Sequence, residues 1–203
     1  MSLDKQLFRD VFDCDKCNHN YGFNRPTPEK PYFKFPPTIG ATGKADLLFV
    51  GINPRISENN RNLHHRIIGD KRAFADLAEN RDGDKAYIAT GCKEKHYHHH
   101  MNIVKMFYGE GSRFEDHAVV TELFLCATGN TQKLPRGHYP CANRFFDRVF
   151  LKVQPRFVIC IWKRVFDYFQ KQAHIVTDEN FPITIGGHTS AVIYLPHPNS
   201  YRH

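Results

Sequence analysis

The sequence predicts an α/β fold with three layers, in which helices cover both faces of a central, mainly parallel sheet of four strands. Segments of strand character alternate with segments of helical periodicity, the pattern typical of parallel sheets with covering helices. The first strand, at residues 45–53, is an almost uninterrupted apolar run, as expected of a strand buried on both faces. The length of 203 residues fits one domain that spans 1–203.

The elements follow from local patterns. An amphipathic helix at 4–13 places Leu7, Val11 and Phe12 on one side. The Pro- and Gly-rich segment 24–44 predicts a loop before the first strand. The expected elements after that strand are a helix at 73–80, a histidine-rich loop at 96–100, a helix at 101–108, a strand at 119–126, a helix at 141–152, a strand at 156–162, a helix at 163–173 and a strand at 191–195.

These elements predict which residues are buried in the core and where the functional site lies. In the helix at 141–152, four apolar residues recur on one side and should face the core: Phe145, Phe146, Val149 and Phe150. Asn53, Cys126 and His197 each stand at the carboxyl end of an expected strand or just beyond it. Ligands of parallel α/β sheets bind at that edge, so we expect the functional site there.

Composition narrows the class of partner. The chain carries 28 Lys and Arg against 21 Asp and Glu, a formal charge of +7, which favours nucleic acid as a partner. No apolar run approaches the roughly 18–20 residues of a membrane span, and the N-terminus lacks the apolar core of a signal peptide. We therefore expect a cytoplasmic protein, a monomer without membrane contact. In a reducing compartment, its six cysteines favour metal binding or burial over disulfides.

Four of these cysteines form two pairs. Cys14 and Cys17 make a C-x-x-C, and Cys126 and Cys141 flank fourteen residues between a strand and a helix. Four thiolates suit either zinc or an iron–sulfur cluster, and their spacing does not separate the two. Cys160 lies in an apolar strand, where a small buried hydrophobe is expected.

Together with two further motifs, these cysteines resemble a known family. The motifs are Gly51-Ile52-Asn53-Pro54, after the first strand, and His197-Pro198-Asn199-Ser200, after the last. With the cysteine pairs they are similar to the uracil-DNA glycosylase superfamily, in particular its iron–sulfur branch, families four and five. The first motif resembles that of the mismatch-specific and single-strand-selective branches.

The resemblance implies a monofunctional DNA glycosylase that hydrolyses the bond between sugar and base after flipping a uracil or related lesion out of DNA. Asn53 would orient the attacking water, and His197 would donate a hydrogen bond to the departing base. It also implies a 4Fe–4S cluster on Cys14, Cys17, Cys126 and Cys141, with zinc as the alternative metal. The base- and DNA-binding candidates are Gly51, Ile52, Pro54, Arg55, Phe74, Glu122, Pro198, Asn199 and Ser200, with Arg61, Arg66, Lys71 and Arg72 as a basic track.

The chain departs from the family at two positions. Arg55 stands where a small residue is usual, and Glu122 stands where the iron–sulfur branch tends to have an asparagine that reads the base. An ionised Glu122 would accept hydrogen bonds only and would favour a base with more donors than uracil, whereas a desolvated one would be protonated and supply a donor. In the other arrangement that stays open, Glu122 points away from the pocket and another group reads the base. Two other functions stay open: a nucleic-acid-binding module of this fold with little or no catalysis, and an unrelated zinc-stabilised α/β protein.

Overall fold

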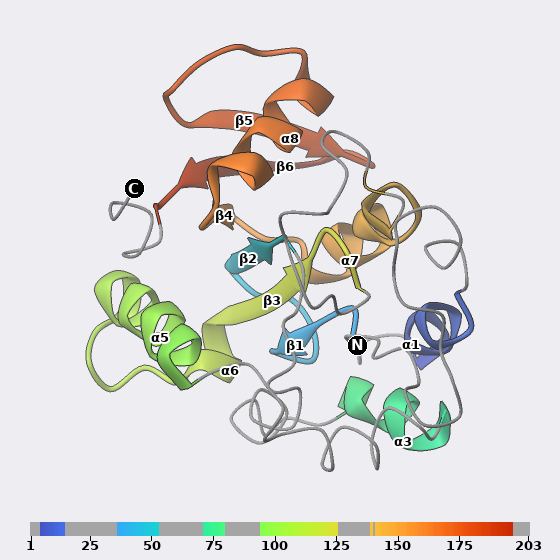
Figure 1. Ribbon diagram of the computed structural model, residues 1–203. Coiled ribbons are helices and arrows are strands. Elements are labelled where there is room, and N and C mark those ends of the chain that lie inside the picture. Colours follow the sequence, from blue (N-terminus) through green and yellow to red (C-terminus); the bar gives the residue numbers. More distant parts are fainter. Residues whose placement is uncertain are drawn as a thin grey trace.

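A six-stranded sheet forms the centre of the computed structural model, which describes residues 5–14, 36–52, 71–79, 94–125, 139 and 141–196. The strand order is β1-β3-β2-β4-β6-β5 (Figure 1). The four inner strands run parallel to one another, and the outer strands β1 and β5 run antiparallel to their neighbours. The strands are β1 (Ile39–Gly40), β2 (Leu47–Gly51), β3 (Ala118–Glu122), β4 (Phe157–Cys160), β5 (Phe181–Ile185) and β6 (His188–Tyr194).

The α/β class and the mainly parallel sheet are confirmed, and the four expected strands are β2, β3, β4 and β6. The prediction of only four strands was wrong, because two antiparallel edge strands were missed. β1 has two residues and lies within the segment expected to be a loop, so it carries no period-2 pattern. β5 contains Pro182, a residue that argues against a central strand but is tolerated at an edge.

Helices cover both faces of the sheet (Figure 1). Phe49 of β2 packs against His100 of α5, with ring centroids 4.6 Å apart. The strand register places Tyr194 of β6 on the opposite face, where it packs against Phe166 of α8. The helices are α1 (Lys5–Phe12), α3 (Lys71–Asp76), the 3-10 turn η2 (Leu77–Glu79), α5 (Glu94–Tyr108), α6 (Phe114–His117), the π-helical η4 (Ala142–Phe146), α7 (Asp147–Val153) and α8 (Lys163–Ala173).

The histidine-rich run 96–100 was predicted as a loop, and this prediction was wrong, because the run lies within α5. The helical stripe of this element passes through Tyr97, His100, Met101 and Val104, at spacings of three, four and seven residues. His100 occupies a core position of that stripe and is 3% exposed. Counting histidine as polar concealed the periodicity.

The predicted core of the helix after Cys141 is confirmed: Phe145, Phe146, Val149 and Phe150 are all buried. Leu7 and Val11 of α1 are buried as expected, together with Phe8. Cys160 is fully buried within β4, as predicted, and burial raises the pKa of its thiol. Among the described residues, no helix combines the length and apolar character needed to cross a membrane.

Candidate functional site

The carboxyl ends of β2 and β3 lie side by side. Gly51, the last residue of β2, is the register partner of Glu122, the last residue of β3. The pairing continues beyond the strands, because the Leu123 amide donates to the Gly51 carbonyl at 3.0 Å and the Phe124 amide donates to the Ile52 carbonyl at 2.9 Å. The first half of the Gly51–Pro54 motif is therefore held in the sheet, and Asn53 is the next residue along the chain.

The strand order makes this edge a place where a ligand can bind. From β2 the chain continues to β3 on one side, and from β4, the other neighbour of β2, it continues to β5 and β6 on the opposite side. Connections that leave neighbouring strands in opposite directions open a crevice at the carboxyl edge. β6, which leads to His197, lies two strands from β2, or about 10 Å at the usual strand spacing.

The side chain of Glu122 extends across β2 at this edge. A Cβ atom added to Gly51 would lie 2.1 Å from Glu122 Oε2, 2.6 Å from its Cδ and 2.7 Å from its Oε1. The carboxyl group thus occupies the space that a side chain at position 51 would fill. Because β4 is the next strand beyond β2, the Glu122 side chain extends from β3 over β2 in the direction of β4.

Burial controls the charge of this carboxyl group. Although part of the residue reaches the surface, Glu122 Oε2 is buried and has no hydrogen-bond partner among the described residues. Burial raises the pKa of Glu122 from 4.5 to about 8. A pKa of about 8 makes the group mainly a neutral carboxylic acid at pH 7, with one donor and one acceptor, which is the protonated one of the two charge states that the sequence left open.

Helix α5 covers the face of the sheet on which this carboxyl lies. Phe49 precedes Gly51 by two residues and so shares its face of β2. The Phe49 ring contacts both His100 of α5 and Phe114 of α6, at centroid distances of 4.6 and 6.1 Å. These rings form a packed apolar layer on the same face of the sheet as the carboxyl, two residues back along β2.

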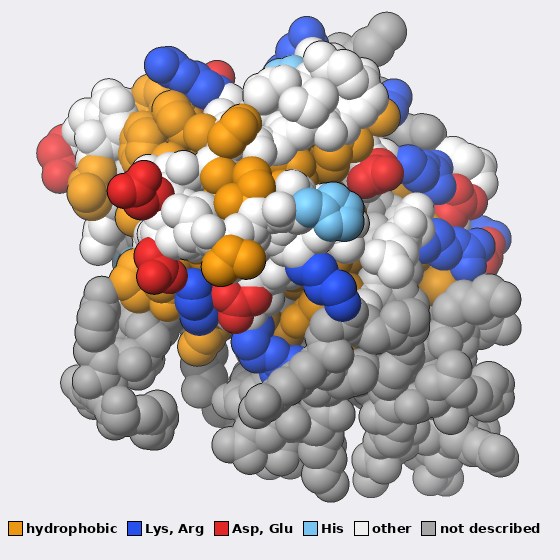
Figure 2. Space-filling model, turned by 90° about the horizontal axis from the view of Figure 1, so that it is seen from above, with side chains coloured by type: hydrophobic (Ala, Val, Ile, Leu, Met, Phe, Trp, Pro, Cys, Tyr) orange, Lys and Arg blue, Asp and Glu red, His pale blue; other side chains and the backbone are white. Residues whose placement is uncertain are grey.

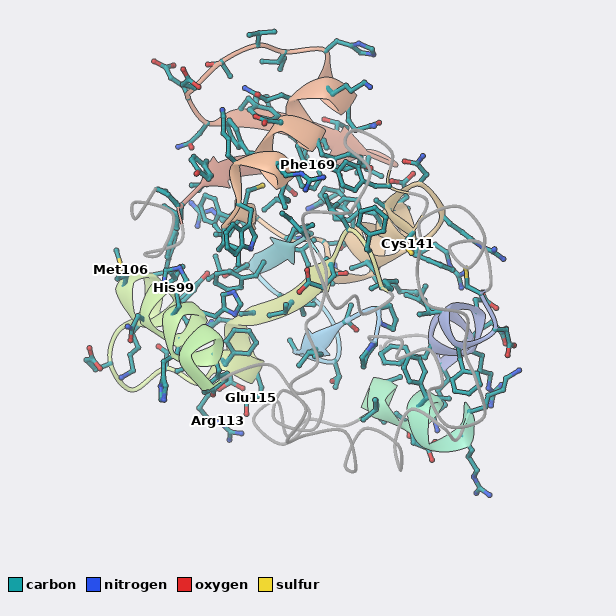
Figure 3. The ribbon with its side chains drawn as sticks, in the orientation of Figure 1. His99, Met106, Arg113, Glu115, Cys141 and Phe169 are labelled. Atoms are coloured by element: carbon teal, nitrogen blue, oxygen red, sulfur yellow. The ribbon has the colours of Figure 1, made fainter. Side chains whose placement is uncertain are left out.

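The two described cysteines of the predicted metal site lie on elements that pack together. Cys14 follows α1, and Cys141 begins the helix that continues as η4 and α7 (Figure 3). Arg144 Nη1 lies 3.8 Å from Cys14 Sγ, and Arg148 Nη1 contacts Asp10 Oδ2 at 2.5 Å. These contacts join the C-terminal part of α1 and Cys14 to η4 and α7.

Their surroundings suit a metal-binding thiolate pair. Cys14 is 7% exposed and Cys141 is 3% exposed, so both are shielded from solvent. The Arg144 guanidinium also brings a positive charge to within 3.8 Å of Cys14 Sγ, which would offset part of the negative charge of a metal–thiolate site. Within the described part of the chain no three potential metal ligands converge, and the other two expected ligands, Cys17 and Cys126, lie outside it.

No protein-family model matches this chain. A search of curated proteins also finds no match. What the chain does is therefore inferred from its own residues: the sheet edge, the buried carboxyl and the cysteine pair.

Several expected site residues lie outside the described residues: Asn53, Pro54, Arg55, His197, Pro198, Asn199 and Ser200, with Arg61 and Arg66 of the basic track. Phe74 was expected to stack on a base. It is instead fully buried, with its ring 6.0 Å from that of Phe8 and 5.5 Å from that of Phe12. It holds α3 against α1, so its position does not support a stacking role.

The basic track is only partly described. Lys71 Nζ contacts Asp13 Oδ2 at 2.5 Å, which offsets its charge locally. On the described part of the face that Figure 2 shows, Lys and Arg side chains are interspersed with Asp and Glu. On α8, for example, Lys163 pairs with Asp167 and Asp178, both at 3.3 Å.

Sequence reasoning missed two features of this site. His100 was not expected in the core beneath it, although its helical spacing from Tyr97 and Val104 was a signal. The contact between Gly51 and Glu122 was also not foreseen. A glycine that ends a buried strand was the available signal, because such glycines often mark a close approach by another group.

Proposed function

We propose that this chain is a monofunctional DNA base glycosylase with the fold of the uracil-DNA glycosylase superfamily. The observation that carries the proposal is the sheet edge at the switch point, where Gly51 and Ile52 of the first motif meet the buried carboxyl of Glu122. Four parallel strands with helices on both faces are the arrangement that the resemblance implies, and the formal charge of +7 favours a polyanionic substrate.

The reaction makes two demands on the site. Cleavage of the bond between sugar and base creates positive charge on the sugar and negative charge on the departing base. In this proposal Asn53, directly after β2, orients the attacking water near the sugar. His197, shortly after β6, donates a hydrogen bond to the base as its negative charge develops. The two strands are about 10 Å apart, a separation that a nucleotide can bridge.

In the same proposal Cys14, Cys17, Cys126 and Cys141 hold a 4Fe–4S cluster. A cluster bound there would act as a structural link between the N-terminal segment and the segment 126–141, since hydrolysis needs no electron transfer. The two buried thiols on packed elements and the guanidinium at Cys14 support a thiolate site of this kind. Zinc on the same four ligands is the alternative.

The test is base release. Purified, metal-loaded protein would be incubated with oligonucleotides that carry uracil, hypoxanthine, xanthine or mismatches, and alkali would then cleave any abasic site formed. We expect release of at least one deaminated base. Asn53→Ala and His197→Ala should each lower the single-turnover rate by roughly 10²–10³-fold, the usual cost of losing one preorganised group.

His174→Asn is the matched control for the loss of an imidazole. His174 is exposed at the end of α8 with a φ of 55°, a conformation that asparagine also tolerates, so the rate should not change. Tight binding of these oligonucleotides without base release would favour the non-catalytic binding module instead. Base release at equal rates by the wild type and both site variants would refute the roles of Asn53 and His197.

A further inference from the structure

Arg144 contacts the proposed cluster site from outside its four cysteines. It follows Cys141 by three residues, on η4, and its Nη1 atom donates to Cys14 Sγ at 3.8 Å. The arginine is therefore next to one expected ligand along the chain and touches another that lies 130 positions away in sequence. Because the sulfur of a neutral thiol is a weak acceptor, this contact by itself adds little to the stability of the fold.

An aromatic ring restricts where the guanidinium of Arg144 lies. The guanidinium lies over the Phe145 ring, with 5.3 Å between its Cζ atom and the ring centroid, and Phe145 is buried in the core. Because a guanidinium is planar, stacking on a ring leaves its N–H groups available to a neighbouring acceptor. The ring thus lowers the entropy cost of holding the N–H donor at the sulfur of Cys14.

The carboxylates at the end of α1 have cations of their own. Asp10 Oδ2 contacts Arg148 Nη1 at 2.5 Å. Asp13 Oδ2 contacts Lys71 Nζ, also at 2.5 Å. Arg144, likewise among the described residues, lies near Asp10 without forming an ion pair with it. The positive charge of Arg144 is therefore available to a group at the cysteines rather than being used by these carboxylates.

A cluster held by four thiolates would make use of such a charge. The thiolates outweigh the charge of the iron–sulfur core, so the assembly is anionic, and one-electron reduction adds a further negative charge. Burying an anion is costly unless a cation or hydrogen-bond donors lie close to it. Charge and hydrogen bonds at the sulfur atoms also set the reduction potential of iron–sulfur clusters, so the potential reports on this balance.

We propose that Arg144 balances the charge of the cluster and raises its reduction potential through the N–H donor and positive charge that it places at Cys14 Sγ. The inference rests on the cluster of the proposed function. A nearby cation stabilises the reduced form more than the oxidised form, because the reduced form carries one more negative charge. Loss of the donor should also loosen the cluster, since groups that support metal ligands typically contribute roughly 10–100-fold to metal affinity.

The experiment compares reduction potentials in the full chain, purified anaerobically and reconstituted with iron and sulfide. Arg144→Lys keeps the charge, Arg144→Gln keeps an N–H donor without the charge, and Arg144→Met keeps neither. Arg156→Gln is the matched control. The Arg156 guanidinium also lies over the ring of the following phenylalanine, 5.0 Å from the centroid of Phe157, but it is near Tyr108 of α5 rather than Cys14. Dithionite supplies one electron to each cluster, no bond forms or breaks, and the reduced fraction is followed by electron paramagnetic resonance.

Arg144→Gln and Arg144→Met should each lower the equilibrium constant of reduction by roughly tenfold, which corresponds to about 59 mV for one electron. Arg144→Lys and Arg156→Gln should stay close to the wild type. Arg144→Met should also lose iron to a chelator roughly 10-fold faster. Equal potentials in the wild type and both neutral variants would overturn the inference, and so would reconstituted protein that holds no iron–sulfur cluster.

Base release, assayed on the same preparations, separates this inference from the proposed glycosylase. A lower potential in the neutral Arg144 variants of a protein that releases no base would support the role of Arg144 and refute the glycosylase. Base release by a protein whose potential does not respond to these substitutions would support the glycosylase and refute the role of Arg144.

Discussion

Replacing Glu122 with glutamine should change how the stability of the protein depends on pH. The pKa of Glu122 is about 8 in the folded state, against 4.5 for an ordinary glutamate. Between these two pH values the unfolded chain releases the proton while the folded chain retains it. The unfolded state then binds fewer protons, so the free energy of unfolding falls as pH rises from about 4.5 to about 8 and levels off above that.

The size of this effect follows from the shift. Each pKa unit corresponds to about 1.4 kcal/mol, so a shift from 4.5 to about 8 amounts to roughly 5 kcal/mol of stability that is present at acidic pH and lost by pH 8. A glutamine of nearly the same shape does not titrate. Glu122→Gln should therefore lack this decline. The free energy of unfolding of Glu122→Gln minus that of the wild type should be several kcal/mol larger at pH 8 than at pH 5.

Urea unfolding at a series of pH values, with the metal content held constant, measures this difference. The wild type and Glu122→Gln carry the same ionisable side chains on α5 and α6, the helices on this face of the sheet, so the contributions of those side chains cancel in the comparison. Glu179→Gln is the control, because Glu179 is exposed and should leave the pH profile unchanged. Parallel pH profiles for wild type and Glu122→Gln would show that the carboxyl is ionised in the folded state, contrary to our reasoning.

Three other substitutions test the packing of the sheet and core and the proposed cluster site. Gly51→Ala should force the neighbouring carboxyl aside and lower the free energy of unfolding, measured in urea, by about 1–3 kcal/mol. In the control Gly111→Ala the new Cβ would meet no atom within 4 Å, so the free energy of unfolding should change by less than about 0.5 kcal/mol. Equal effects of the two substitutions would contradict the close contact at Gly51. Cys141→Ser should remove most of the iron and sulfide from anaerobically purified protein, while Cys160→Ala, in the core of β4, should retain them; iron retained in both variants would exclude Cys141 as a ligand. Phe169→Ala should lower the free energy of unfolding by about 3–5 kcal/mol, because the fully buried Phe169 ring (Figure 3) packs 5.1 Å from that of Phe146. Phe169→Leu should lower it less. A decrease below about 1 kcal/mol for Phe169→Ala would place this ring outside the core.

The sequence alone predicts the helices and strands that show a periodic or apolar pattern within their own segment. The helix after Cys141 shows this, because Phe145, Phe146, Val149 and Phe150 recur at helical spacing and all four are buried. The four central strands were likewise visible as apolar runs. Asn53 and His197 could be placed after strands because chain order alone puts them there.

Tertiary structure decided the features that depend on neighbours distant in sequence. β1 is a strand only because β3 provides hydrogen-bonding partners for Ile39 and Gly40, and no local pattern marks it. His100 belongs to the core because Phe49 and Phe114 surround it. In each case the position of a residue depends on contacts that local periodicity does not contain.

The same reason applies to the candidate site. The sequence offers Gly51 and Glu122 as two residues 71 positions apart, and a glycine at a strand end signals a close approach without identifying the group that makes it. Their contact arises because β2 and β3 are parallel neighbours in a register that pairs these two residues. That pairing buries the carboxyl, and burial rather than residue type determines that it is neutral. The charge state of the site is therefore a property of the folded sheet, since desolvation depends on which side chains pack around a group and not on its place in the chain.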